Sequence, residues 1–415
     1  MTSFVTRAIA STTLASWGAA AGLAMAAAVA QAQTEVRVLV PYNSPDTGRV
    51  YEAAAEGFEA EHPGIDIRIE VVGWDRLYQR LTGETGGGSD PDVAIVATRW
   101  LVDFVANDTV VPLDDYMTPA FRDLFIPAFL EPTEIDGRIW GLPAAASARA
   151  LYYNRLLFAE AGIAAPPATW EQLEADARAL SVLGEDIHGF GLQGDEIETD
   201  IYFYYAMWAH GGELTEADGS SGLDSDGAIA AAELYRRLID EGLTQPDVTA
   251  HSREDLQGLF RTGRLGMMIT GPWMGDVLAQ DSPGLEYAVA PIPAATRSAT
   301  FGITDSAVLF ASSQVKHEAW QFLEFIFQPG IRSDIAEGFL PTTVAVADRD
   351  LRGSDPVRAA FAATLPDARF LPTIPNWEVV ADVTSNALRR IYRGDQPVRE
   401  ALEAAAAEID SILGQ

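Results

Sequence analysis

Residues 265–276 read LGMMITGPWMGD, an apolar run that stops at a Gly-Pro pair followed by a tryptophan. Bulky apolar side chains suit a buried strand, whereas Gly271 and Pro272 end it. The pattern therefore displays Trp273 just beyond a strand end, where open α/β sheets bind ligands. An indole there either stacks on the apolar face of a sugar ring or packs in the core. The segment alone leaves both interpretations open.

The N-terminal part of the chain also alternates between strands and helices. Residues 36–40 form an apolar strand pattern, followed by a polar loop at residues 41–48 and a helical stretch at residues 49–61. Further strands are predicted at residues 65–72 and 93–96. This order and spacing predict an α/β fold of parallel βαβ units, with ligand groups in the loops after the strands.

The rest of the chain continues in the same style. Helices are predicted for residues 170–183, 202–209, 229–241, 253–261, 316–327, 379–393 and 398–413, and strands for residues 149–153, 286–290 and 307–311. The glycine-rich residues 84–90 lack a following Lys-Ser/Thr pair and do not open from a strand, so they indicate a turn rather than a phosphate cradle.

The first 32 residues have the layout of a secretory signal. Arg7 is their one charge, residues 8–30 are mostly apolar, and small residues follow at Ala30-Gln31-Ala32. We expect cleavage before Gln33, or before Gln31, in preference to a retained membrane anchor, because the run is alanine-rich and broken by glycine. The chain has no cysteine, which excludes disulfides and a lipid-modified cysteine. A periplasmic protein that is not a lipoprotein is therefore expected.

Composition narrows the class of function. The chain has 28 basic and 60 acidic residues, a net charge of −32, which argues against nucleic-acid binding. Its 415 residues suffice for two lobes, each with a core. The five histidines show no metal-ligand spacing, and there is no GxSxG nucleophile motif. We expect no metal, no cofactor and no enzyme, although paired carboxylates of a glycoside hydrolase depend on the fold and stay open.

Several motifs occur in an order and spacing that span the whole mature chain. They are GLP at 141–143, RALYYN at 149–154, the segment 162–170, WAHGGE at 208–213, the segment 260–273, and LPT at 340–342. With these motifs the chain resembles the family 1 extracellular solute-binding proteins of ABC importers, the carbohydrate-binding, maltose-binding-protein-like family.

The resemblance implies a type II periplasmic binding protein fold, with two α/β lobes joined by crossing strands around a ligand cleft. By analogy, the signal peptide is 1–32, the first lobe is 33–146 and 305–342, and the second lobe is 147–304 and 343–415. A hinge closes such lobes around the ligand, because bound ligand contacts both of them. The expected partners are a small carbohydrate-like ligand and the transmembrane subunits of an ABC permease. The protein itself is expected to be a monomer.

The resemblance also assigns ligand contacts residue by residue. Asn43 and Asp46 fall in the first loop of the family, where polar side chains meet sugar hydroxyls. Tyr202, Trp273 and Trp377 fall where the family places aromatic side chains, with Trp273 matching its stacking tryptophan. The structural alternatives are a turn or helix cap for Asn43 and Asp46, and core packing for the aromatic residues.

Three further positions bear on the charge of the ligand. Arg99 follows the third strand, and Ser147 matches a position that holds a carboxylate in the maltose-binding protein, which argues against maltose. Arg149 has the strand parity of Ser147 and is expected to face the same side. The alternative roles are pairing across the hinge for Arg149 and holding a carbonyl or carboxylate for Arg99.

Three hypotheses follow. The first is a periplasmic receptor that captures a carbohydrate or a carbohydrate-derived solute for an ABC importer. The second keeps the receptor but changes the ligand to an anion, such as a uronate, a sulfonated sugar or a glycerophosphodiester, held by Arg99 and Arg149. The third is a secreted glycoside hydrolase.

Overall fold

The computed structural model describes residues 33–43, 46–83, 91–195, 198–335, 339–350, 356–371, 374 and 376–414. The predicted signal and its cleavage site, and the glycine-rich turn, lie outside these residues. Within them, no helix combines the length and the apolar character needed to cross a bilayer.

Strands and helices alternate in the first part of the described chain, as predicted. The elements of its first part are β1 (Thr34–Pro41), α1 (Thr47–Glu61), β2 (Ile65–Val72), α2 (Trp74–Gly83), β3 (Val93–Ala97), η1 (Thr98–Trp100), α3 (Leu101–Ala106), α4 (Pro119–Arg122), α5 (Pro127–Leu130), η2 (Glu131–Thr133), β4 (Glu134–Ile135), β5 (Arg138–Ile139) and β6 (Leu142–Ser147).

The second part holds more helix than strand. Its elements are β7 (Ala150–Asn154), α6 (Arg155–Glu160), α7 (Trp170–Ser181), β8 (His188–Gly191), α8 (Ile201–Ala209), α9 (Asp226–Asp240), η3 (Val248–Ala250), α10 (Arg253–Arg261), β9 (Leu265–Thr270), α11 (Met274–Asp281), β10 (Tyr287–Ala290), β11 (Thr300–Phe301), β12 (Ile303–Leu309), α12 (Lys316–Ile326), α13 (Pro329–Ile335), α14 (Val344–Asp350), α15 (Pro356–Thr364), η4 (Leu365–Asp367), β13 (Ala368–Arg369), α16 (Trp377–Arg393) and α17 (Val398–Leu413).

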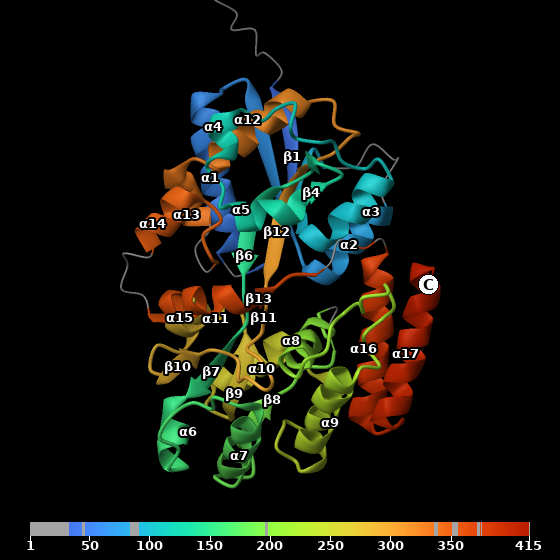
Figure 1. The fold of residues 1–415 in the computed structure, drawn as a ribbon. Coiled ribbons are helices and arrows are strands. Elements are labelled where there is room, and N and C mark those ends of the chain that lie inside the picture. Colours follow the sequence, from blue (N-terminus) through green and yellow to red (C-terminus); the bar gives the residue numbers. More distant parts are fainter. Residues whose placement is uncertain are drawn as a thin grey trace, which may run out of the picture. The chain divides into compact units, whose positions relative to one another are not determined.

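The sheet of the first lobe has the order β2-β1-β3-β12-β6. β1 pairs in parallel with β2 and β3, as the βαβ prediction requires, while β12 runs antiparallel to both of its neighbours. Helices cover both faces of this sheet (Figure 1). Val93 and Ile95 pack in the cluster that includes α1 and α12, and Ala94 and Val96 in the cluster that includes α2 and α3. Alternate side chains thus enter opposite cores, which explains the continuous apolar runs.

The sheet of the second lobe has the order β10-β7-β9-β8. Its strand β9 is buried along its whole length, as the apolar run that precedes Gly271 predicts. Met267 and Ile269 join the core formed with α7, α8, α9, α16 and α17, whereas Met268 faces the cluster with α10 and α15. This strand therefore ends inside a rigid, doubly covered sheet, which holds the following residues in place.

Two segments connect the lobes next to each other. β6 of the first sheet leads through Ala148 and Arg149 into β7 of the second, and β12 enters the first sheet directly after β11. A later passage includes α14, which packs against α13, and α15, which packs against β7 and β10. The predicted boundary at residue 342 precedes α14.

Some element bounds differ from those expected. The strand expected at residues 307–311 spans Ile303–Leu309, because pairing with β6 extends it through Thr304 and Asp305. The strand expected from Arg149 begins at Ala150, so Arg149 lies between strands. The expectations contained no separate strand for β6 or β8, whose small residues lack a clear apolar pattern.

Close packing of α7 on β8 generates a stability prediction. A Cβ on Gly189 would lie 2.3 Å from the backbone oxygen of Ala177, so the helix must move away. We expect Gly189→Ala to lower the free energy of unfolding by about 1–3 kcal/mol, measured by urea denaturation. Gly64→Ala is the control, since no atom lies within 4 Å of its added Cβ. Equal stability of both variants would contradict the packing.

Candidate functional site

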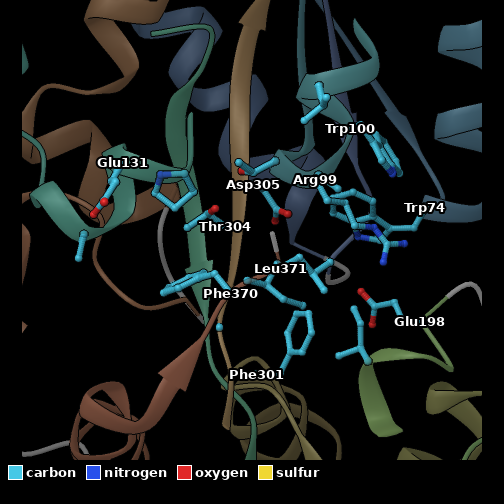
Figure 2. Close-up of a pocket in the computed structure, with 18 residues that line it drawn as sticks. Trp74, Arg99, Trp100, Glu131, Glu198, Phe301, Thr304, Asp305, Phe370 and Leu371 are labelled. Carbon is cyan, nitrogen blue, oxygen red and sulfur yellow. The ribbon is translucent and has the colours of Figure 1, made fainter. Parts of the chain in front are cut away.

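Two adjoining cavities form a cleft beside the crossing strands. The large compartment has a volume of about 440 Å³, and the small compartment about 30 Å³. Trp74, Glu198, Ile303 and Asp305 line both of them. Because these residues come from α2, the segment before α8, and β12, the cleft is built by both lobes. Figure 2 shows the large compartment and its side chains.

Trp273 lies on one wall of the small compartment, three residues after β9 ends. Its indole folds back over Gly271, where a Cβ would lie 2.1 Å from a ring carbon. The Gly-Pro-Trp sequence therefore stops the strand and also leaves room for the ring. Guanidinium carbons of Arg149 and Arg253 lie 5.0 and 5.2 Å from the indole centroid, within the range of cation–π attraction.

Arg149 is the buried cation of this wall. Its side chain has no exposed surface, and its Nη1 donates to Ser147 Oγ at 3.1 Å. Its Nη2 lies 3.4 Å from Glu198 Oε2, to which Arg253 Nη1 donates at 2.9 Å. Tyr202 packs beneath the same guanidinium, 5.6 Å from ring centroid to carbon. One carboxylate thus serves two arginines that face the small compartment.

Arg99 lines the large compartment and forms an ion-pair network between the lobes. It follows β3, and its Nε lies 2.7 Å from Glu378 Oε1 in α16, while its Nη1 lies 3.6 Å from Asp200 Oδ2. Trp100 Nε1 donates to Glu378 Oε1 at 2.7 Å. Burial raises the pKa of Asp200 to about 7, although the nearby Arg99 lowers it. We call Arg99, Trp100, Asp200 and Glu378 the interlobe network.

Four of the predicted ligand residues come together in the small compartment: Asn43, Ser147, Arg149 and Trp273. Asn43 Oδ1 also accepts a hydrogen bond from Trp74 Nε1 at 2.9 Å, so it orients an indole that lines both compartments. Their contact with ligand stays a prediction.

The other predicted residues lie elsewhere. Arg99 lines only the large compartment. Asp46 pairs with Arg49 at 2.8 Å and lines neither compartment. Tyr202 is buried beneath Arg149, and Trp377 is buried in the second-lobe core against Tyr204. The structure thus places these two aromatic side chains behind the cleft wall.

Sequence reasoning did not single out several wall residues. Arg253 follows the N-cap Ser252 of α10 and therefore looks like an ordinary surface position. Phe301, Phe370 and Leu371 line the large compartment from segments without a ligand motif. Asp305 alone had a usable signal, because an acidic residue inside an apolar strand pattern is unusual.

The described residues offer no candidate metal site. No three of their His, Cys, Asp or Glu side chains are grouped so that they could hold a metal ion. The arrangement offers aromatic faces, arginine donors and carboxylate acceptors around a cavity, which are the means of binding a polar solute.

A cleft between two α/β lobes, beside strands that cross from one to the other, defines the type II periplasmic binding protein fold. The chain belongs to the bacterial extracellular solute-binding protein family, whose sequence profile matches residues 43–332. Both findings confirm the resemblance and the fold class expected from the sequence.

Individual proteins of known name are also similar to this chain in sequence or in structure. The chain is 49% identical over 401 residues to a putative binding protein of Brucella abortus (strain 2308), covering 95% of this chain and 98% of the relative. It is 24% identical to the maltotriose-binding protein of Pyrococcus abyssi, covering 91% and 80%. An ABC transporter solute-binding protein from Thermotoga lettingae, solved with alpha-D-tagatose, has a TM-score of 0.85 at 22% identity, covering 92% and 100%.

Removing one partner of the interlobe network is expected to lower the free energy of unfolding strongly. Glu378→Gln leaves the buried Arg99 with less compensating charge, so we expect a loss of about 3 kcal/mol in the free energy of unfolding. Glu241→Gln is the control, because its pair with Arg178 is 40–46% exposed and is expected to contribute about 1 kcal/mol or less. Urea denaturation of both variants measures the difference, and similar losses would contradict the prediction.

The pKa of Asp200 predicts how stability depends on pH. Its pKa is about 7 in the folded protein, against about 4 in an unfolded chain. The folded state therefore binds this proton more tightly, and the stabilisation present at low pH is lost as pH rises through 7. As the pH rises from 5 to 8, the melting temperature of Asp200→Asn should therefore increase relative to that of wild type. The exposed Asp186→Asn is the control, and a constant difference for Asp200→Asn would refute the assignment.

Proposed function

We propose that this chain is the solute-binding component of an ABC importer and captures a carbohydrate or carbohydrate-derived ligand in the periplasm. Its membership of an extracellular solute-binding family supports the receptor class. The relatives and neighbours named above include proteins described with maltotriose and with alpha-D-tagatose, which supports a polyhydroxylated ligand. In this proposal the signal peptide is removed, and the mature receptor delivers its ligand to the permease subunits.

The observation that carries the proposal is the two-compartment cleft. The large compartment, at about 440 Å³, falls in the size range of small-molecule sites. Its walls alternate apolar surface from Phe301, Phe370 and Leu371 with polar groups. A sugar has the same two characters, because its ring faces are apolar and its hydroxyls lie at the edge. Trp273 and Trp74 would pack against ring faces, while carboxylates and arginines would bind hydroxyls.

Lobe closure is the proposed mechanism, and it involves no bond chemistry. Ligand contacts from both lobes favour the closed state by the difference in affinity between the two states. The pairing of Arg99 with Glu378 and Asp200 already joins the lobes at the cleft, so it would add to the stability of a closed form. Closure would then present a surface from both lobes to the permease.

The two alternatives have less support. For an anionic solute, Arg99 and Arg149 would have to bind oxyanions, yet each already faces carboxylates. For a glycoside hydrolase, the carboxylates of Glu198 and Asp305 lie in the cleft, but the family consists of binding proteins. Turnover of an aryl glycoside by the pure protein would favour the enzyme, and saturable binding without turnover the receptor.

Replacing Trp273 tests the proposed site. A ligand that binds only the folded state raises the melting temperature, so a thermal-shift screen of neutral sugars and sugar acids is expected to find a ligand for wild type. Trp273→Ala should remove at least most of that shift, because it deletes the aromatic wall and loosens Arg149 and Arg253.

Trp140→Ala is the matched control, since this indole donates to Ile135 O at 3.1 Å and lines neither compartment. It should keep the ligand-induced shift even if its own melting temperature falls. An undiminished shift in Trp273→Ala would remove that residue from the site.

A further inference from the structure

Asp305 is a buried carboxylate that the ion-pair networks do not use. Only 6% of the residue is exposed, and its side chain forms no hydrogen bond or ion pair with the described residues. It nevertheless lines both compartments. Figure 2 shows its carboxylate and that of Glu198 directed toward the same open space from different lobes. Buried polar groups normally have partners, so this one requires an explanation.

The backbone of β12 directs Asp305 into the cleft. Asp305 pairs with Ala97 of β3 on one side and with Ala145 of β6 on the other, so its main chain lies in the middle of the sheet. The register with β6 shifts between Asp305 and Ser306. Such irregularities change the direction of side chains and are frequent beside functional sites. The carboxylate is thus held by a rigid strand rather than by a loop.

The charges around Asp305 do not supply a dedicated counterion. Arg99 and Arg149 lower its pKa and Glu198 raises it, but burial has the largest effect and raises the pKa to about 8. Arg149 shares Glu198 with Arg253, and Arg99 pairs with Glu378 and Asp200. Burial, and to a smaller extent Asp305, raises the pKa of Tyr51 in α1. A ligand that donates hydrogen bonds would compensate Asp305 where the protein does not.

We propose that Asp305 is a ligand-binding residue that accepts hydrogen bonds from the hydroxyls of a neutral polyhydroxylated ligand spanning both compartments, and that it excludes the corresponding acids. This inference rests on the proposed carbohydrate receptor and names the residue that selects within it. When Asp305 is ionised, its carboxylate accepts two hydroxyl donors, whereas a ligand carboxylate would meet Asp305, Glu198 and Glu131 as like charges.

The test compares each neutral sugar with its acid, in which a carboxylate replaces the terminal hydroxymethyl group. Glucose, galactose and mannose are each titrated by calorimetry beside the corresponding uronate, with wild type at pH 9, where Asp305 with its pKa of about 8 is ionised. We expect at least one neutral sugar to bind, and to bind at least 10-fold more tightly than its uronate. Tighter binding of a uronate than of its neutral sugar by wild type would overturn the proposed selection.

Variants then assign the selection to Asp305. Asp305→Asn should weaken the neutral sugar by about 10- to 100-fold, the range expected for loss of a hydrogen bond to a charged group. It should leave the uronate unchanged or improve it, so the ratio of the two affinities falls. Asp305→Glu keeps the charge but moves the acceptor, so it should lose sugar affinity and still reject the uronate. A merely structural role would not move this ratio.

Asp334→Asn is the control, since Asp334 lies exposed on α13 outside both compartments. An unchanged affinity ratio in Asp305→Asn, with the wild type still binding a neutral sugar, would refute the role of Asp305 and leave the receptor intact. If no member of the panel binds wild type, the carbohydrate receptor and this inference fail together.

Discussion

The burial of Arg149 is the constraint on which the rest of the cleft depends. A guanidinium stays charged at any physiological pH and has no exposed surface here, so the protein has to surround it with acceptors and aromatic faces. Glu198, Ser147, Tyr202 and Trp273 fulfil that requirement. Because these groups come from different elements of the chain, the one charge holds the end of β6, the segment before α8 and the turn after β9 in a single arrangement.

A second group of charges acts across the lobes. Arg99 lies in η1 directly after β3, and its partners are Glu378 in the first turn of α16 and Asp200 at the N-cap of α8. The strand β12 runs between this network and the wall formed by Arg149, and it carries Asp305 into both compartments. The cleft is therefore shaped by paired charges on two sides and, in the middle, by a carboxylate that has no ion pair or hydrogen bond among the described residues. This arrangement is the basis of the proposal that the ligand is rich in hydroxyl groups rather than ionic.

The parts of the fold that followed from the sequence are those with a local pattern. The spacing of Tyr51, Ala54, Ala55 and Phe58 marks the buried face of α1, and the order of strand, helix and strand in β1, α1 and β2 leads to parallel pairing. β6 and β8 were not predicted separately, because alanine and glycine residues satisfy a strand through pairing and close approach rather than through apolar bulk. Gly189, pressed against Ala177, is an example.

The residues of the site also fall into a group that the sequence predicts and a group that only the structure reveals. From its sequence, this protein could be assigned to an α/β class and a solute-binding family, and Trp273, Asn43, Ser147 and Arg149 could be placed near one cleft, because strand ends and motif order are local properties. Only the tertiary structure placed Trp377 and Tyr202 behind the wall, brought Arg253 onto Trp273, and left Asp305 without an ion pair or hydrogen bond in the described part of the chain. Burial and charge pairing depend on which distant segments meet, and no local pattern encodes that meeting.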